Sequence, residues 1–271
     1  MDASLKVQFW GTRGWISTPS LQTTVYGGNT TSLQVLHGDL LVGVDAGFGI
    51  CNWGEQLAKR IVEKPEPLEI HVFLTRFHWD HIQGLPFFHP IYSPSTRLHL
   101  YAPYPKAYTR EKLEILFTAN YSPFSGLDSM ESHMEIEEIS KEICIGDLRV
   151  QVGEKSEANG VPYRFFAPDG SSLVVAAQSP SLPDFAAGTD LLILDAACTQ
   201  AEEKAGYPGW GGGTYEEALS LAQASQAKRL ICTRHGPYRT DKALFTASLQ
   251  AGFVPAKEGE IYSVTLSTVL V

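Results

Sequence analysis

Residues 72–84 read VFLTRFHWDHIQG, and this stretch joins a predicted buried strand to a cluster of ionisable side chains. The strand is indicated by a short apolar run rich in β-forming residues, namely Ile70, Val72, Phe73 and Leu74. Four ionisable side chains follow within six residues: Arg76, His78, Asp80 and His81. Because α/β proteins usually hold their sites at the carboxyl ends of strands, we expect the functional site of this chain here.

The residues that follow Arg76 are suited to binding a divalent metal. His78, Asp80 and His81 can converge on one point from a single loop, and imidazole and carboxylate groups are common metal ligands. Arg76 does not fit this interpretation, because arginine stays protonated and has no lone pair to offer a cation. The alternative is structural: His78 and Asp80 would form a hydrogen-bonded pair, and His81 would cap the helix that follows.

Length and composition indicate an ordinary globular protein. The chain has 271 residues, 44% hydrophobic and 19% charged, enough for a substantial core in one large domain or two small ones. Its net charge of −9 argues against an extensive nucleic-acid-binding face, although it leaves room for a local basic pocket. No apolar run is long enough to span a bilayer, and the N-terminal MDASLKVQFW has no signal-peptide core. The four cysteines are scattered along the chain. We therefore expect a cytoplasmic protein with free thiols and no membrane partner.

The order of predicted elements indicates two β-sheets packed together, with helices outside. Helices are predicted over Asn52–Lys64, Lys106–Tyr121, Thr214–Ala227 and Asp241–Gln250. Strands are predicted over Leu5–Phe9, Ser32–Leu36, Leu40–Asp45, Arg97–Ala102, Met134–Ile139, Asp147–Val152, Val161–Ala167, Ser172–Ala177, Leu191–Asp195, Arg229–Thr233 and Ile261–Leu266. No internal repeat or linker interrupts the chain, so we predict a single α/β domain over residues 1–271.

Two local motifs add detail to this pattern. The segment DAGFG, residues Asp45–Gly49, leaves a strand on small residues, so its backbone can lie close to whatever covers the end of the sheet. Thr214 and Glu217 have the spacing of a capping box, which predicts the start of a helix.

The chain resembles the metallo-β-lactamase fold proteins, and among them the branch of phosphodiesterases and tRNA 3′-processing endonucleases (ribonuclease Z). The motifs that carry the resemblance occur in the family's order: WGTRG at 10–14, YGGNT at 26–30, VDAGFGI at 44–50, HWDHIQGLPFF at 78–88, LLILDA at 191–196, GWGGGT at 209–214 and HGPYRTD at 235–241. The resemblance implies an αββα sandwich of two mixed β-sheets, with a site along one edge that normally holds two zinc or manganese ions. It also suggests a homodimer.

This chain departs from the family at the metal ligands. The family's motif His-x-His-x-Asp-His is here Arg76-Phe-His78-Trp-Asp80-His81, so the first ligand is lost. By resemblance, the later positions fall on Ser156 for a histidine, Gln178 for the bridging aspartate, and Arg234 or the adjacent His235 for the last histidine. The carboxylate of Asp195 is kept, whereas residues 210–214, WGGGT, lack the histidine that some endonuclease relatives use as a proton donor.

These replacements predict that no ordinary dinuclear metal centre forms. Two unit charges at about 4 Å repel by roughly 4 kcal/mol at intermediate dielectric, and two divalent ions by about fourfold more. Gln178 would remove the bridging charge that offsets this repulsion, and Arg76 would add positive charge. We hypothesise that Arg76 and Arg234 fill the two ion positions and pair with Asp80 and any other remaining acid.

The function favoured by these residues is that of a non-catalytic or impaired homologue without a cofactor, which binds an anionic phosphate-like or nucleotide-like ligand or a protein partner. Because guanidinium groups bind phosphate well, the candidate ligand-binding residues are Arg76, His78, Gln178, Arg234 and His235. The first alternative is a phosphodiester hydrolase with one Zn or Mn ion on His78, Asp80, His81 and His235. In that hydrolase Asp80 and Asp195 would be the residual catalytic residues. The second alternative is a structural, dimeric scaffold.

Overall fold

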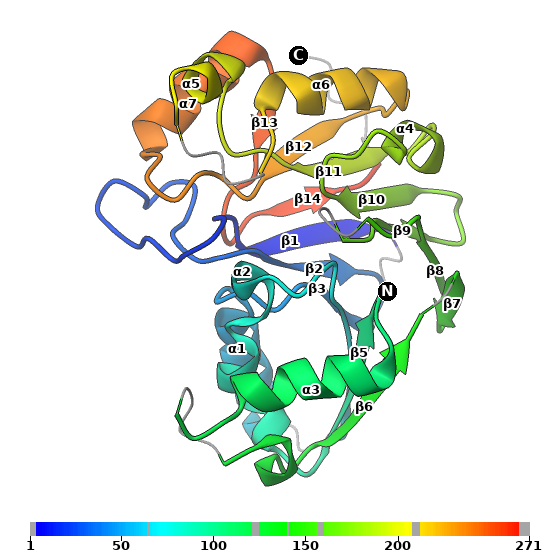
Figure 1. The fold of residues 1–271 in the computed structure, drawn as a ribbon. Helices are drawn as coiled ribbons and strands as arrows, with labels where there is room; N and C mark the ends of the chain where they lie inside the picture. Colours follow the sequence, from blue (N-terminus) through cyan, green and yellow to red (C-terminus); the bar gives the residue numbers. More distant parts are fainter. Residues whose placement is uncertain are drawn as a thin grey trace.

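The computed structural model has two seven-stranded β-sheets that pack face to face, with helices on both outer faces (Figure 1). The structure describes residues 4–63, 66–120, 125–139, 141–156, 160–207 and 212–265. In spatial order, the first sheet contains β14 (Ile261–Ser263), β1 (Lys6–Gly11), β2 (Ser32–Leu36), β3 (Leu41–Val44), β4 (Leu68–Phe73), β5 (Thr96–Ala102) and β6 (His133–Glu138). The second contains β13 (Val254–Pro255), β12 (Leu230–Thr233), β11 (Leu191–Asp195), β10 (Ser172–Ala176), β9 (Tyr163–Phe166), β8 (Leu148–Val152) and β7 (Glu142–Ile145).

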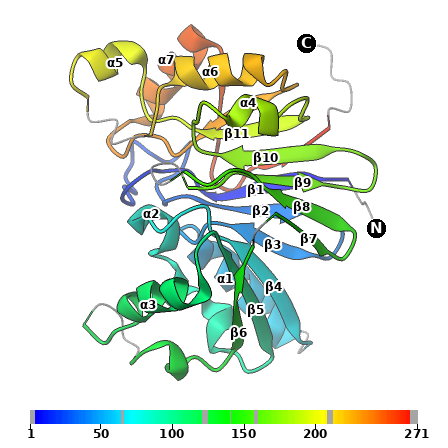
Figure 2. The ribbon, with the colours of Figure 1, turned by 45° about the vertical axis from the view of Figure 1, so that its right-hand side comes forward.

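The helices cover the two sheets from opposite sides, which confirms the predicted αββα sandwich (Figures 1 and 2). The first sheet is covered by α1 (Ile50–Glu63) and α3 (Lys106–Leu116), and the second by α4 (Leu182–Phe185), α6 (Tyr215–Ala224) and α7 (Asp241–Ala251). The remaining helical segments are short: α2 (Trp79–Ile82), α5 (Gln200–Lys204), η1 (Leu85–Phe87), η2 (His89–Tyr92) and η3 (Leu127–Ser129).

Alternating side chains of β4 show how the sequence builds these layers. Phe73 belongs to the apolar cluster between the sheets, whereas Ile70 and Val72 belong to the cluster beneath α1, together with Trp53. Successive residues of a strand point to opposite faces, so a strand covered on both sides is apolar at nearly every position. This is why residues 72–74 form a continuous apolar run.

Parallel pairing brings the carboxyl ends of several strands to one edge. β4 is parallel to β3 and β5, and β11 is parallel to β10 and β12. Asp45 follows β3, Arg76 follows β4 after two further residues, Asp195 ends β11 and Arg234 follows β12. Residues far apart in the sequence therefore meet at this edge.

The predicted hairpins are confirmed, whereas several element ends were wrong. β2 pairs antiparallel with β3, and β9 pairs antiparallel with β10. The helix predicted to reach Tyr121 ends at Leu116, and His81 lies inside α2 instead of capping it. Strand β7 and the short helices α2, α4 and α5 were not predicted. The predicted ends Lys64, Tyr121 and Leu266 lie outside the described residues.

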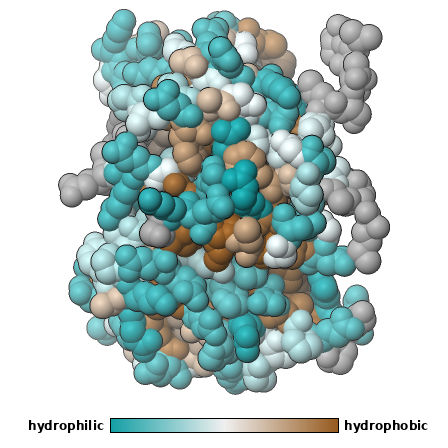
Figure 3. All heavy atoms as spheres, turned by 90° about the vertical axis from the view of Figure 1, so that its right-hand side faces the viewer, coloured by the Kyte–Doolittle hydropathy of each residue, from teal (hydrophilic) through white to brown (hydrophobic). Residues whose placement is uncertain are grey.

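The surface on the side where β7 and β8 lie has apolar residues gathered near its middle, with hydrophilic residues around them (Figure 3). No helix in the described part of the chain is both long enough and apolar enough to cross a membrane. The single domain over residues 1–271, the cytoplasmic location and the homodimer stay predictions.

Gly47 shows the close backbone packing that the DAGFG segment predicts. A Cβ atom on Gly47 would lie 2.3 Å from the carbonyl oxygen of Asp80 and 2.4 Å from that of Thr31. The amide of Gly47 also donates to the Thr31 carbonyl at 3.0 Å. The loop after β3, the start of β2 and α2 are thus held together through backbone contacts that only glycine allows.

We expect Gly47→Ala to destabilise the protein by about 1–3 kcal/mol, the usual cost of forcing extra atoms into a packed interior. The control is Gly38→Asn at an exposed turn with φ +55, where no atom lies within 4 Å of a built Cβ. Asparagine tolerates this left-handed conformation, so its effect should stay within about 0.5 kcal/mol. Chemical denaturation measures both changes, and a fully stable Gly47→Ala protein would contradict the contact.

Candidate functional site

The predicted site residues meet where β3 and β4 of the first sheet end beside β11 and β12 of the second. All of the side chains that converge there are buried, with at most 7% of their residue surface exposed. We call this group the ion cluster, and it consists of Asp45, Arg76, Asp80, His81, Asp195 and Arg234. Asp80 and His81 come from α2, and the other four follow or end strands.

The centre of the ion cluster is a hydrogen-bonded ion pair between Asp80 and Arg234. Nε of Arg234 donates to Oδ2 of Asp80 at 2.7 Å, and the two residues are 1% and 0% exposed. The backbone amide of Trp15 donates to the same carboxylate oxygen at 2.8 Å. The carboxylate of Asp80 therefore joins α2, the end of β12 and the loop after β1.

The backbone of Arg234 is in an unusual conformation, with φ at +57°. A left-handed conformation is uncommon for a residue other than glycine, and it is maintained only where the surroundings fix it. Here the guanidinium lies 4.7 Å above the centre of the Trp15 ring, in a cation–π contact. This contact and the bond to Asp80 hold the Arg234 side chain at the edge of the sheets.

The electrostatics of the pair favour the charged form of both groups. Burial alone would raise the pKa of Asp80, but the neighbouring His81, His78 and Arg234 lower it far below its usual value. Burial alone would lower the pKa of Arg234, but Asp195 and Asp80 raise it above its usual value. Asp80 and Arg234 are therefore an ion pair throughout the physiological pH range.

A second ion pair extends this arrangement to Asp195. Nη2 of Arg76 donates to Oδ2 of Asp195, and Nη1 of Arg234 lies 3.9 Å from the same oxygen. Arg76, Asp195, Arg234 and Asp80 thus form a continuous series of alternating charges. The hypothesis that both arginines pair with Asp80 and a remaining acid agrees with these contacts.

Asp45 and His81 form the third part of the ion cluster, and Asp45 was not among the predicted site residues. His81 Nδ1 lies 2.8 Å from Oδ2 of Asp45, while Oδ1 of Asp45 accepts from the backbone amide of Thr75 at 2.8 Å. His81 Nε2 lies 3.7 Å from Oδ2 of Asp80. The signal for Asp45 was present in the sequence, because it follows a buried strand directly, but it was interpreted only as part of a small-residue loop.

The side chain of Gln178 forms hydrogen bonds with backbone carbonyl groups. Its Nε2 donates to the carbonyl oxygens of Asp195 at 2.7 Å and Thr214 at 2.9 Å, so it ties the end of β11 to the start of α6. Ser156, the other position at which the resemblance expects a ligand, pairs with Gly160 through backbone hydrogen bonds of 2.8 Å. Residues 208–211, which include part of the GWGGGT motif, lie outside the described chain.

His78 lies at the rim of the ion cluster. Its side chain is 45% exposed, and its Nδ1 is 3.6 Å from Oδ1 of Asp80. Its ring packs against Trp15, with 4.9 Å between the ring centres. His78 is thus the predicted site residue that solvent reaches most easily.

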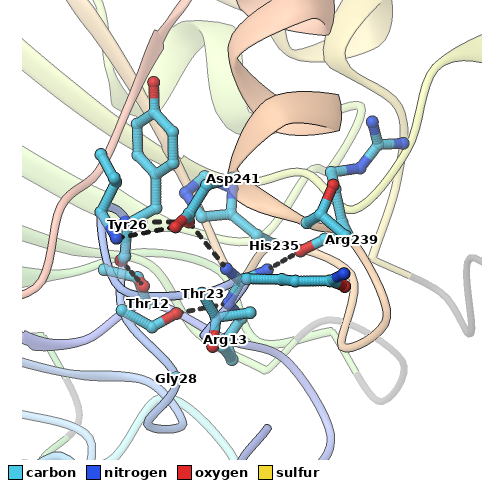
Figure 4. A network of polar contacts seen from close by, with 12 residues as sticks. Thr12, Arg13, Thr23, Tyr26, Gly28, His235, Arg239 and Asp241 are labelled. Atoms are coloured by element: carbon cyan, nitrogen blue, oxygen red, sulfur yellow. Dashed lines mark hydrogen bonds and ion pairs between the residues drawn. The ribbon is translucent and has the colours of Figure 1, made fainter. Parts of the chain in front are cut away.

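His235 faces a different network, which surrounds the buried Arg13 (Figure 4). Its Nε2 lies 3.2 Å from the carbonyl oxygen of Ala256, and burial together with the charges of Arg13 and Arg239 lowers its pKa to about 3. Arg13 donates to the Arg239 carbonyl at 2.6 Å and lies 3.7 Å from the Asp241 carboxylate. The structure therefore brings His78, Asp80 and His81 together but does not add His235 to them.

The ion cluster offers a poor ligand set for a pair of divalent ions. Oδ2 of Asp80 already accepts from Arg234 and Trp15, and Oδ2 of Asp195 accepts from Arg76. An incoming metal would have to displace guanidinium groups that keep their protons and repel it. Among the described residues, the groups of three or more side chains whose ligand atoms converge within 4.8 Å all lie elsewhere.

Comparison with known proteins agrees with this geometry at the level of the fold. Residues 42–235 match the family model of the beta-lactamase superfamily domain, which is more than half of the chain. The chain belongs to the beta-lactamase superfamily. No sequence among the curated proteins is significantly similar to it.

Solved structures of this superfamily are similar over nearly the whole chain. The metallo-β-lactamase fold protein YhfI from Bacillus subtilis is 19% identical, with a TM-score of 0.66, covering 96% of this chain and 99% of that one. A diphosphatase of the PhnP family is 17% identical, with a TM-score of 0.66 and coverages of 96% and 97%. The short form of human tRNase Z is 15% identical, with a TM-score of 0.63 and coverages of 96% and 100%. At these identities the similarity establishes the metallo-β-lactamase fold and nothing finer.

A double-mutant cycle on Arg234 and Asp80 tests the central ion pair. Arg234→Met leaves the Asp80 carboxylate buried without its partner, and we expect a loss of about 3–5 kcal/mol in the free energy of unfolding. Arg234→Met combined with Asp80→Asn should recover most of that loss. The control is Arg149→Met, which breaks the exposed pair with Glu142 and should cost about 1 kcal/mol or less. Additive effects of the two buried substitutions in chemical denaturation would contradict a direct pair.

The lowered pKa of His235 makes stability depend on pH. Because the unfolded state binds this proton near pH 6.5 and the folded state only near pH 3, the stabilising contribution is complete above about 6.5 and is lost as the pH falls toward 3. His235→Gln should flatten the fall between pH 6 and 4 by about 1.4 kcal/mol per pH unit. Urea unfolding at several pH values measures this slope. The exposed His89→Gln should keep the wild-type slope, and an unchanged slope in His235→Gln would contradict the assignment.

Proposed function

We propose that the protein is a non-catalytic member of the beta-lactamase superfamily, in which the ion cluster takes the place of the metal centre and binds a small anionic ligand. The observation that carries this proposal is the buried hydrogen bond between Arg234 Nε and Asp80 Oδ2, at 2.7 Å. The Asp80 carboxylate lies in the segment that resembles the family's metal-ligand motif, and it is paired with Arg234, a side chain that stays positively charged. A guanidinium can neutralise and orient an anion, but it cannot lower the pKa of a water molecule as a metal ion does.

Unused donors support an anionic ligand at this place. Arg76 Nε and Arg234 Nη2 are buried and have no hydrogen-bond partner among the described residues. Buried donors without partners are costly, so a group with several acceptor oxygens would be stabilised by them. Phosphate and carboxylate groups have such oxygens and match the planar fork of arginine.

A phosphate-bearing ligand is the more specific form of this proposal. Two of the structural neighbours are named a diphosphatase and a tRNase Z, and both names imply phosphate compounds. His78 and Trp15 lie beside Arg234 and would give such a ligand an aromatic surface at the rim. The rival proposal of a phosphodiester hydrolase with one metal ion has less support, because His235 bonds to the Ala256 carbonyl instead of joining His78, Asp80 and His81.

Calorimetric titration with inorganic phosphate and with a nucleoside monophosphate, on protein freed of metal by EDTA, tests the binding. We expect saturable binding that Arg76→Gln weakens by at least about tenfold, since a charge-assisted bond to an anion contributes about 1.5–3 kcal/mol. The exposed Arg110→Gln is the control and should bind like the wild type. Hydrolysis of a generic phosphodiester with added Zn²⁺ or Mn²⁺ should remain at background in both the wild type and Asp80→Asn.

Two results would contradict the proposal in different ways. Metal-dependent hydrolysis that Asp80→Asn abolishes would identify a mononuclear hydrolase. No binding of either anion, or binding that Arg76→Gln leaves unchanged, would leave the ion cluster with a structural role alone.

A further inference from the structure

One face of β4 and β5 is directed toward the second sheet. This face is apolar at Phe73 and Tyr101 and becomes polar toward the start of both strands. Phe73 and Tyr101 are cross-strand partners and belong to the core between the sheets. Two residues earlier on each strand, His71 pairs with His99, and Glu69 follows His71 toward the surface. Alternate residues of a strand share a face, so Glu69, His71 and His99 lie side by side at the open end of the inter-sheet layer.

His71 is hydrogen-bonded through its Nδ1 atom, whereas His99 is hydrogen-bonded through Nε2 and has a longer ion-pair contact at Nδ1. Nδ1 of His71 lies 3.0 Å from the hydroxyl of Tyr101, and Nδ1 of His99 lies 3.6 Å from the Glu135 carboxylate. Histidines that bind metals are commonly oriented in this way, by an outer partner on the nitrogen that is not the ligand. Nε2 of His71 is then available on the other side, and Nε2 of His99 lies against the carboxylate of Glu69, the third candidate ligand.

The distances among the three side chains suit a tetrahedral ion. Nε2 of His99 lies 3.2 Å from Oε1 of Glu69. Two ligands about 2.0–2.1 Å from one zinc ion at the tetrahedral angle lie about 3.3 Å apart. Ligand atoms of Glu69, His71 and His99 all fall within 4.8 Å of one another. The two rings are nearly parallel, at 10° with centres 4.7 Å apart, so His99 must turn about its terminal torsion to direct both lone pairs at one ion.

The lone pairs and the access that an ion needs are present. His71 is 9% exposed, and Nε2 makes no hydrogen bond to any described residue. Glu69 and His71 line a surface cavity of about 470 Å³, which also includes Arg60 and Cys144 and gives an ion a path from solvent.

We propose that Glu69, His71 and His99 form a binding site for Zn²⁺ or a similar divalent ion that prefers imidazole ligands. Two histidines and one carboxylate are a common zinc ligand set that leaves the fourth position for water or another ligand. This site lies on β4 and β5 and shares no residue with the ion cluster, so it does not depend on the proposed function. The neighbouring group of His99, Glu135 and Glu137 is less suited, because Lys106 binds Glu137 at 3.2 Å and only one histidine contributes.

Zinc titration of the full chain, freed of metal beforehand and followed by calorimetry and thermal melting at pH 7, tests the site. We expect one saturable Zn²⁺ ion per chain that raises the melting temperature by mass action. His71→Gln and His99→Gln should each lower the affinity more than about 100-fold, and Tyr101→Phe, which removes an outer partner, about 10–100-fold. His89→Gln, at an exposed histidine in η2, and His78→Gln, in the ion cluster's rim, should both keep the wild-type affinity.

Melting without zinc separates loss of the ligand from loss of the fold. The His99 side chain is 13% exposed, so the zinc affinity of His99→Gln is compared with the wild type only where the zinc-free protein melts near the wild-type temperature. Absence of saturable zinc binding in the wild type would overturn the proposal. Zinc binding that is unchanged in both His71→Gln and His99→Gln would also overturn it. Loss of zinc binding in His78→Gln would do the same, as would loss in Glu137→Gln together with unchanged binding in His71→Gln.

Discussion

The hydrogen-bonded ion pair between Asp80 and Arg234 is the interaction on which the geometry of the site depends. Both residues are almost completely buried, and burying an ion costs several kcal/mol unless partners compensate it. Asp80 accepts hydrogen bonds from the Arg234 side chain and from the backbone amide of Trp15. Arg234 also lies near Asp195 and over the Trp15 ring. The pair therefore fixes α2, the end of β12 and the loop after β1 relative to one another, and removing either charge leaves the other without its hydrogen-bonded ionic partner.

The same pair is the reason for proposing a binding function without catalysis in a fold that resembles metal-dependent hydrolases. A metal centre brings positive charge together with a bound water that can be activated, whereas an arginine brings only the charge. In this chain Arg76 and Arg234 contact the two carboxylates Asp195 and Asp80 at the edge where the superfamily motif lies. In the proposed function, the free donors of the two arginines would bind an anion, and no metal ion would activate a water molecule. Among the described residues, Glu69, His71 and His99 bring three possible ligand atoms within 4.8 Å of one another on a different part of the first sheet.

Much of the fold could be predicted from the sequence, because its long elements carry clear periodicity. The run Ile70–Leu74 and the hairpin of β2 and β3 identified buried strands, and the pairing of both arginines with acids followed from their place in the ligand motif. Segments of four or five residues, such as α2 and α5, are shorter than the window in which periodicity can be read. They were missed for that reason.

The directions of side chains at the site could not be predicted. Arg234 and His235 are adjacent, and the left-handed backbone of Arg234, with φ at +57°, lets the former reach Asp80 while the latter enters the Arg13 network. The resemblance placed Gln178 at the position of a bridging aspartate, whereas in the structure it donates to two backbone carbonyls, an arrangement that only the folded loops create. Asp45 was overlooked because its partner His81 is distant in the sequence and was assigned to a metal or to a helix cap.

The most direct measurement is anomalous diffraction from crystals grown with excess Mn²⁺ or Zn²⁺. We expect the guanidinium of Arg234 to stay on the Asp80 carboxylate, with no anomalous peak between Asp80, His81 and Asp195. A metal peak at that place, with Arg76 and Arg234 turned away from their carboxylates, would contradict it.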